Sequence, residues 1–150
     1  VGRIKGRDGE AKMSKSLGNT VGILADEDGV WESVRRAVTD PQRVRHDDPG
    51  RPEVCHVFSL HKLVTDASLI SDIEEQCKAG TRGCVDCKRI LADSLVREFA
   101  PFRERAEHLR AHPEEVRGVL EAGADRAREV ARETLGEARA RMGIKWRSVL

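Results

Sequence analysis

The sequence has no tyrosine, no long apolar run and almost no net charge, and each absence removes a class of function. No stretch approaches the ~20 apolar residues of a membrane span, and the first residues lack the apolar segment of a secretion signal. Three Phe and two Trp are too few for the aromatic platform of a single-strand binder. Lys and Arg total 27 against 26 Asp and Glu, so a nucleic-acid surface must be a local basic patch. We expect a cytoplasmic protein without membrane contact.

Glycine and proline divide the chain into an irregular start and a helical remainder. Residues 1–20 are predicted to be a mobile, glycine-containing loop, and the apolar run Val21–Leu24 a short strand. Apolar residues then recur every three to four positions up to residue 142, which is typical of amphipathic helices. Pro101 should kink or restart the longest helix, and Pro113 should begin the last. The expected fold class is mainly α: a helical bundle preceded by an irregular loop and a short strand.

A lysine- and serine-rich loop is the sharpest motif. Its residues are Lys12, Met13, Ser14, Lys15 and Ser16. Two ammonium groups three residues apart can neutralise charge on a triphosphate, and hydroxyl and backbone N–H groups can donate to its oxygens. The composition alone favours a solvated polar loop over a phosphate site, because short motifs have many false positives. The loop is therefore a candidate ATP-phosphate site with Lys12 and Lys15 as catalytic cations.

Four cysteines follow the spacing C-x21-C-x6-C-x2-C, at Cys55, Cys77, Cys84 and Cys87. Without a secretion signal, disulfides are disfavoured. Four thiolates suit tetrahedral zinc or a [4Fe–4S] cluster, and the spacing does not separate the two. Plain reduced thiols are the remaining interpretation. His56, next to Cys55, is an outside candidate ligand and is more simply explained as a structural residue.

Basic residues flank the cysteines: Lys78, Arg82, Lys88 and Arg89. A basic patch beside a metal site would suit RNA phosphates. An ordinary solvated helix face explains the same residues equally well.

Several segments resemble one known family. Lys12–Ser16 matches the signature loop of class I aminoacyl-tRNA synthetases letter for letter, and its surroundings resemble the bacterial-type tryptophanyl-tRNA synthetases. Four further segments agree in the same order: residues 37–41, 48–53, 83–88 and 101–105. The resemblance implies that residues 1–27 are the edge of a Rossmann-type catalytic domain. It implies that residues 28–150 are a C-terminal, helical anticodon-binding region with the cysteine site at 55–87.

The resemblance also implies a reaction and its partners. Tryptophan and ATP, with Mg²⁺, would give tryptophanyl-adenylate, and the tryptophanyl group would pass to tRNA(Trp) in a homodimer. A subset of the family carries a [4Fe–4S] cluster on nearly this cysteine spacing, which favours the cluster over zinc. The family's other ATP-gripping motif and its tryptophan pocket are not in this sequence, so we expect the chain alone to be inactive. The alternatives are a free-standing, metal-stabilised RNA-binding module and a structural zinc domain, although a pure binding module has no use for Lys12–Ser16.

Overall fold

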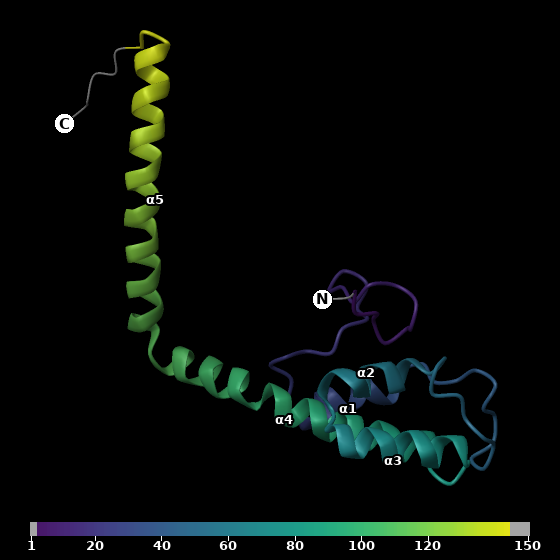
Figure 1. Cartoon of the computed structure of the whole chain (residues 1–150). Helices are drawn as coiled ribbons and strands as arrows, with labels where there is room; N and C mark the ends of the chain where they lie inside the picture. Colours follow the sequence, from purple (N-terminus) through teal and green to yellow (C-terminus); the bar gives the residue numbers. More distant parts are fainter. Residues whose placement is uncertain (1–2, 145–150) are drawn as a thin grey trace. The chain divides into compact units, whose positions relative to one another are not determined.

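The computed structural model describes residues 3–144, and its regular elements are five helices (Figure 1). They are α1 (Glu27–Arg35), α2 (His56–Val64), α3 (Ala67–Lys78), α4 (Cys84–Ala111) and α5 (Pro113–Arg141). The chain forms two compact units, Val1–Glu104 and Arg105–Leu150. Residues 1–27 and the first three helices fall in the same unit. The ends of the predicted 1–27 and 28–150 segments lie outside the described residues. None of the described helices is long and apolar enough to cross a membrane.

The core of the first unit joins α1, α2, α3 and α4. On α1, Val30 and Val34 are four residues apart and both buried, so one stripe of this short helix faces inward. Asp26 begins α1 by accepting a hydrogen bond from the Gly29 N–H at 2.8 Å. The other helices supply the remaining buried apolar side chains, among them Val57, Phe58, Ile73, Leu91 and Leu95.

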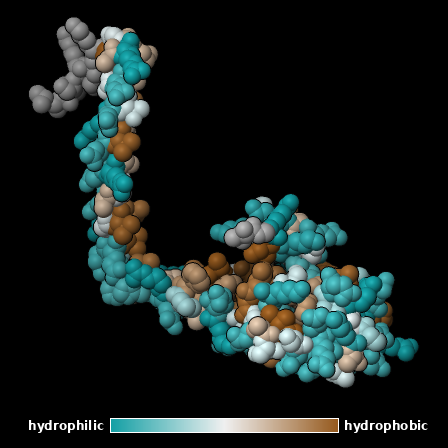
Figure 2. All heavy atoms as spheres, viewed as in Figure 1, coloured by the Kyte–Doolittle hydropathy of each residue, from teal (hydrophilic) through white to brown (hydrophobic). Residues whose placement is uncertain are grey.

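The predicted strand and the predicted bundle are both wrong. Between residues 3 and 144 the structure contains no strand, only an isolated antiparallel bridge between Lys5 and Lys12. The run Val21–Leu24 has no partner strand, and its Gly22 carbonyl accepts the Ala25 N–H in a turn. No residue of α5 is buried, and Figure 2 shows apolar side chains on the surface along this helix. Apolar periodicity identifies a helix face, but it does not say whether anything covers that face.

The sequence analysis expected Pro101 to kink or restart the longest helix, and the structure shows no restart. Helix α4 continues through it from Cys84 to Ala111. The Arg103 guanidinium donates to the Val96 carbonyl at 2.8 Å, which gives a carbonyl near the proline a second donor. The carbonyl that lacks its helical donor because of Pro101 is that of Arg97, four residues earlier, so the Arg103 bond does not replace the missing N–H.

Candidate functional site

The lysine- and serine-rich loop starts from a tight backbone turn. The Gly6 N–H donates to the Ala11 carbonyl at 2.8 Å, and the Met13 N–H donates to the Ile4 carbonyl at 3.0 Å. Inside the turn, Asp8 Oδ1 accepts the N–H groups of Glu10 and Ala11 at 3.0 and 3.1 Å. These bonds fix the chain on the N-terminal side of Lys12.

Asn19 closes the loop from the other side and is almost fully buried. Its Oδ1 accepts the Ser14 N–H at 2.8 Å, and its Nδ2 donates to Asp8 Oδ2 at 2.6 Å and to the Lys12 carbonyl at 3.3 Å. The bond from Asn19 is the main reason that the pKa of Asp8 is lowered. A Cβ on Gly6 would collide with the Asn19 amide. The sequence analysis gave Asn19 no role, although an Asn directly after a glycine is a common signal of a tight turn.

The hydrogen bonds of Asn19, called the clasp below, do not involve the charged side chains of the loop. Lys12, Lys15 and Ser16 are exposed, and Ser14 and Met13 are half-buried. Among the described residues, neither lysine forms an ion pair. The hydroxyls of Ser14 and Ser16 lie 2.8 Å apart. The loop therefore presents two unpaired ammonium groups and a pair of hydroxyls on a fixed backbone, as an anion site requires.

All four cysteines line one small, partly enclosed cavity in the first unit. Cys55 precedes α2, Cys77 lies near the end of α3, and Cys84 and Cys87 lie in the first turn of α4. Gly50 fits against Cys77, because a Cβ at this position would touch the Cys77 sulfur. The Gly50 N–H also donates to the Cys77 carbonyl at 2.8 Å. The structure therefore brings together the ligand set that the spacing predicted, and all four thiols are free.

The sulfur atoms are spread more widely than one zinc ion requires. Tetrahedral zinc with bonds of about 2.3 Å holds its sulfur ligands about 3.8 Å apart. Among the described residues, no three cysteine sulfurs lie within 4.8 Å of one another. Burial is the main reason that the pKa of the Cys87 thiol rises to about 12, with neighbouring thiolates adding to the rise. Burial likewise raises the pKa of Cys55 and Cys77. Four thiolates here need a cationic occupant.

Two arginines line the same cavity and have donors without partners. Arg43 Nη1 lies 3.8 Å from the Cys77 sulfur, and its Nη2 donates to the His46 and Arg82 carbonyls at 2.6 and 2.8 Å. Within the described part of the chain, the buried Nε atoms of Arg43 and Arg82 have no hydrogen-bond partner. Orphaned buried donors are costly and usually mark a missing acceptor. The two arginines beside the cavity suit an occupant whose net charge, with its four thiolate ligands included, is negative.

His61 supports the cavity from α2. Its Nε2 lies 3.1 Å from the Cys87 carbonyl and 3.4 Å from the Cys87 sulfur, and its Nδ1 lies 2.9 Å from the Thr65 hydroxyl. Burial is the main reason that the pKa of His61 falls to about 4. At neutral pH the ring is therefore uncharged and bridges α2 to α4. The sequence analysis gave this histidine no role and missed the bridge.

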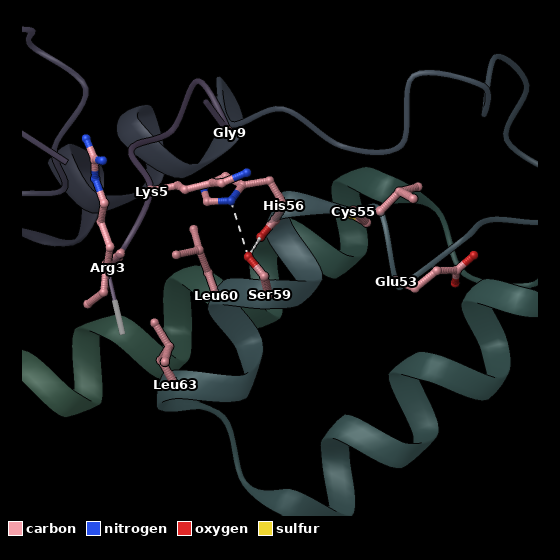
Figure 3. Close-up of a pocket in the computed structure, with 11 residues that line it drawn as sticks. Arg3, Lys5, Gly9, Glu53, Cys55, His56, Ser59, Leu60 and Leu63 are labelled. Atoms are coloured by element: carbon pink, nitrogen blue, oxygen red, sulfur yellow. Dashed lines mark hydrogen bonds between the residues drawn. The ribbon is translucent and has the colours of Figure 1, made fainter. Parts of the chain in front are cut away.

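His56 belongs to a different cavity, shown in Figure 3, of about 420 Å³. Arg3, Lys5 and Gly9 line one side, and residues of α2 line the other. His56 does not line the cysteine cavity, so the structure does not place it there as a ligand. Its Nδ1 lies 3.2 Å from the Ser59 hydroxyl, while its buried Nε2 has no partner among the described residues. Burial, with Lys5 adding to it, lowers the pKa of His56.

The basic residues near the cysteines have separate surroundings. Arg82 lines the cysteine cavity. Lys78 is exposed and pairs with Glu74 at 2.5 Å, one turn earlier on α3. Arg82 therefore lies beside the thiols, whereas Lys78 lies on a solvated helix face.

The other two basic residues of this set contact α1. Lys88 donates to the Arg35 carbonyl at 2.8 Å, and burial lowers the pKa of its ammonium group. The guanidinium of Arg89 lies over the Trp31 ring, 3.5 Å from its centroid. A stacked arginine of this kind helps hold α4 on α1.

The loop and the surrounding helices define a class of protein. The family model of class I tRNA synthetases (W and Y) matches residues 3–100, which include Lys12–Ser16 and all four cysteines. The chain belongs to this family. The matched segment ends at residue 100.

The similar proteins are tryptophan-specific synthetases. The tryptophan–tRNA ligase of Aquifex aeolicus is 46% identical over 143 residues, covering 95% of this chain and 36% of the relative. That of Deinococcus radiodurans is 42% identical, covering 95% and 43%. The structure of tryptophanyl-tRNA synthetase from Campylobacter jejuni, complexed with ADP and tryptophan, matches with a TM-score of 0.85 at 29% identity, covering 95% and 44%. The chain thus spans less than half the length of these relatives.

The matches correct the predicted division of the chain. The matching family model is that of the catalytic domain, and it runs through α1, α2, α3 and most of α4. The sequence analysis had assigned these helices to a C-terminal anticodon-binding region, and that assignment is wrong. The assignment came from the resemblance of short segments, which identifies a family but does not mark where one domain of that family ends and the next begins.

Proposed function

We propose that this chain supplies the ATP-phosphate loop of a tryptophan–tRNA ligase. The observation that carries the proposal is the fixed loop with its two unpaired lysines, Lys12 and Lys15, inside the segment that matches the family. Met13, Ser14 and Ser16 complete the ATP-contacting set. A relative's structure contains ADP and tryptophan, which supports a nucleotide and an amino acid as the two small ligands.

The proposed reaction uses the loop as an electrostatic clamp. A carboxylate oxygen of tryptophan attacks the α-phosphorus of ATP, the bond to the β-phosphate bridging oxygen breaks, and pyrophosphate leaves with that electron pair. Lys12 and Lys15 neutralise charge on the leaving pyrophosphate, and the Ser14 and Ser16 hydroxyls donate to its oxygens. The 3′-terminal hydroxyl of tRNA(Trp) then attacks the adenylate carbonyl and releases AMP. Mg²⁺ would accompany ATP.

The complete protein is required for this activity. The chain spans less than half the length of its relatives. We therefore propose that tryptophan and ATP bind only when the rest of the protein is present, and that the complete protein is a homodimer. The 150-residue chain alone should show no tryptophan-dependent ATP–pyrophosphate exchange. Robust exchange by the purified chain would contradict this.

The test of the loop is Lys15→Ala in the complete protein. Loss of one preorganised cation should slow adenylate formation by about 10²–10³-fold, or ~3 kcal/mol, with little change in tryptophan binding. Lys62→Ala is the matched control, because Lys62 is an equally exposed lysine on α2. Single-turnover ATP consumption measures the step. An unchanged rate in Lys15→Ala removes Lys15 from the mechanism.

We further propose that Cys55, Cys77, Cys84 and Cys87 hold one [4Fe–4S] cluster. One cavity shared by four thiols supports a bound metal centre, and the two arginines that line it suit the negative charge of either occupant. Sulfur spacing wider than a zinc tetrahedron favours the cluster over zinc. When bound, the cluster would act as a structural tie between the start of α2 and the start of α4. Its binding energy would add directly to folding.

Metal analysis separates the two occupants. Protein purified without oxygen should be brown, with about four irons and four acid-labile sulfides per chain. Colourless protein with one zinc per chain would leave a structural zinc site. Any single Cys→Ser change should raise hydrogen exchange in residues 50–90 far more than in residues 113–141. Protein that takes up neither metal leaves four plain thiols and contradicts the proposal.

For tRNA, we propose that phosphates are contacted by the basic residues beside the cysteines: Lys78, Arg82, Lys88 and Arg89. The support is their place in the sequence beside Cys77, Cys84 and Cys87, with Lys78 and Arg89 exposed. Binding of this kind should be strongly salt-dependent, because each phosphate contact releases counterions.

A further inference from the structure

Three potential metal ligands meet where α4 ends and α5 begins, all within the unit Arg105–Leu150. His108 lies in the last turn of α4, His112 precedes α5, and Glu115 lies in the first turn of α5. One ligand atom from each lies within 4.8 Å of the other two. In the part of the chain that the structure describes, no other three His, Cys, Asp or Glu residues come this close.

The tautomer of His112 suits a metal ligand. Its Nδ1 lies 2.9 Å from the His108 carbonyl oxygen. Because a carbonyl only accepts, the proton sits on Nδ1 and the Nε2 lone pair of the neutral ring is free. A backbone carbonyl on the far nitrogen is a usual way in which metal-binding histidines are held. The two imidazoles also stack, with centroids 4.3 Å apart.

His108 and Glu115 hold a proton where an ion can sit. His108 Nε2 lies 2.7 Å from Glu115 Oε1. Tetrahedral zinc binds nitrogen and oxygen at about 2.0–2.2 Å, which places neighbouring ligands about 3.3 Å apart. Small side-chain rotations therefore let a metal ion replace the shared proton. The other carboxylate oxygen of Glu115 lies 3.4 Å from Arg105, so the carboxylate is held from its far side.

We propose that His108, His112 and Glu115 form a site for a divalent first-row metal ion, with zinc as the expected occupant. Two imidazoles and one carboxylate are a donor set that suits zinc, with water completing the tetrahedron. All three side chains are exposed, so the ion enters directly from solvent. Since the ligands come from both sides of Pro113, the bound ion ties the end of α4 to the start of α5. The site shares no residue with the synthetase loop or the cysteines.

Calorimetric zinc titration of the full chain tests the site. His112→Ala and Glu115→Gln should each weaken one binding event at least about 100-fold, since removal of even a second-shell partner weakens metal affinity roughly 10–100-fold. Glu114→Gln is the matched control: it removes the same charge one position earlier in the first turn of α5, and it should leave that event unchanged.

Two further readouts separate this site from the cysteines and from a loss of folding. With cobalt as the probe, the event lost in His112→Ala should lack the thiolate charge-transfer absorption that cysteine ligands produce. Zinc should slow hydrogen exchange in residues 108–116 of the parent and not of His112→Ala, at equal helix content by circular dichroism. Equal zinc affinity in the parent, His112→Ala and Glu115→Gln overturns the proposal, and so does the absence of any thiolate-free binding event.

Discussion

Helices α1–α4 and helix α5 are equally helical, but only the first group has a core. Val30, Val57, Ile73 and Leu91 in the first unit are 0% exposed. No residue of α5 is buried, and Leu120 is 67% exposed. A helix can therefore form from local sequence alone: α5 has Pro at its start, acids in its first turn and bases in its last. Its stability is then local, whereas that of the first unit depends on packing.

Truncation of a core residue should show this difference most strongly. Leu91→Ala should lower the free energy of unfolding of the first unit by about 2–5 kcal/mol, because it opens a cavity among α1–α4. Leu120→Ala, the same change on α5, should alter stability by less than about 0.5 kcal/mol. Denaturant unfolding followed by Trp31 fluorescence measures the first unit. Equal losses in the two variants would show that α5 also packs against something.

Asp40 is the next most sensitive position, and it should make stability depend on pH. Its carboxylate is buried and accepts bonds from the Arg51 guanidinium at 2.6 and 3.1 Å, from the Arg51 N–H at 3.0 Å and from the Gln42 N–H at 3.0 Å. The Arg51 bond is the main reason that the pKa of Asp40 is far below its usual value. Asp40→Asn should cost about 2–3 kcal/mol at pH 7.

The sign of the pH effect follows from the depressed pKa. The ionised form is favoured by folding, so the contribution is complete above the unfolded pKa of about 3.9 and is lost as pH falls toward the folded value. The difference between the parent and Asp40→Asn should therefore shrink below about pH 4. Unfolding midpoints measured from pH 7 downward check this. A difference that stays constant to pH 2 would exclude the Asp40 carboxylate as its source.

Charge reversal tests whether the first unit or α5 contributes more to tRNA affinity. In the complete protein, Arg82→Glu with Lys88→Glu should weaken tRNA binding about tenfold at low salt and reduce the salt slope by about two phosphate contacts. The control is Arg128→Glu with Arg132→Glu on α5, which makes the same charge change. Iron and zinc content must match the parent, because Arg82 lines the cysteine cavity. Unchanged affinity in the first pair would assign it to a solvated face.

The smallest effect should come from a glycine inside α5. Gly123 is exposed, and a Cβ there would meet nothing within 4 Å. Gly123→Ala should stabilise α5 by roughly 0.5–1 kcal/mol, because alanine has the higher helix propensity. Hydrogen exchange should slow in α5 and stay unchanged in α1–α4. Slower exchange in both regions would show that their stabilities are linked.

The sequence predicted the family of this chain better than its packing. The four cysteines were singled out because their spacing has few other uses, and the Lys12–Ser16 loop because it matches a family signature letter for letter. The clasp by Asn19 and the bridge by His61 were missed. Each depends on contacts between residues that are separated in the chain and whose separation follows no spacing rule. The strand at Val21–Leu24 was wrong because strand formation requires a partner, which local apolarity does not reveal.

The start of α2 separates two cavities and contributes lining residues to both. Cys55 and His56 are consecutive residues: Cys55 lines both cavities, while His56 lines only the one beside the base of the lysine loop. The first turn of α2 has no side-chain cap, so its position is set by what lies on either side of it. A substitution at Cys55 would therefore disturb both cavities in one event. In the complete protein, Cys55→Ser should then lower the proposed nucleotide turnover as well as any bound metal, although no cysteine belongs to the proposed ATP-contacting set.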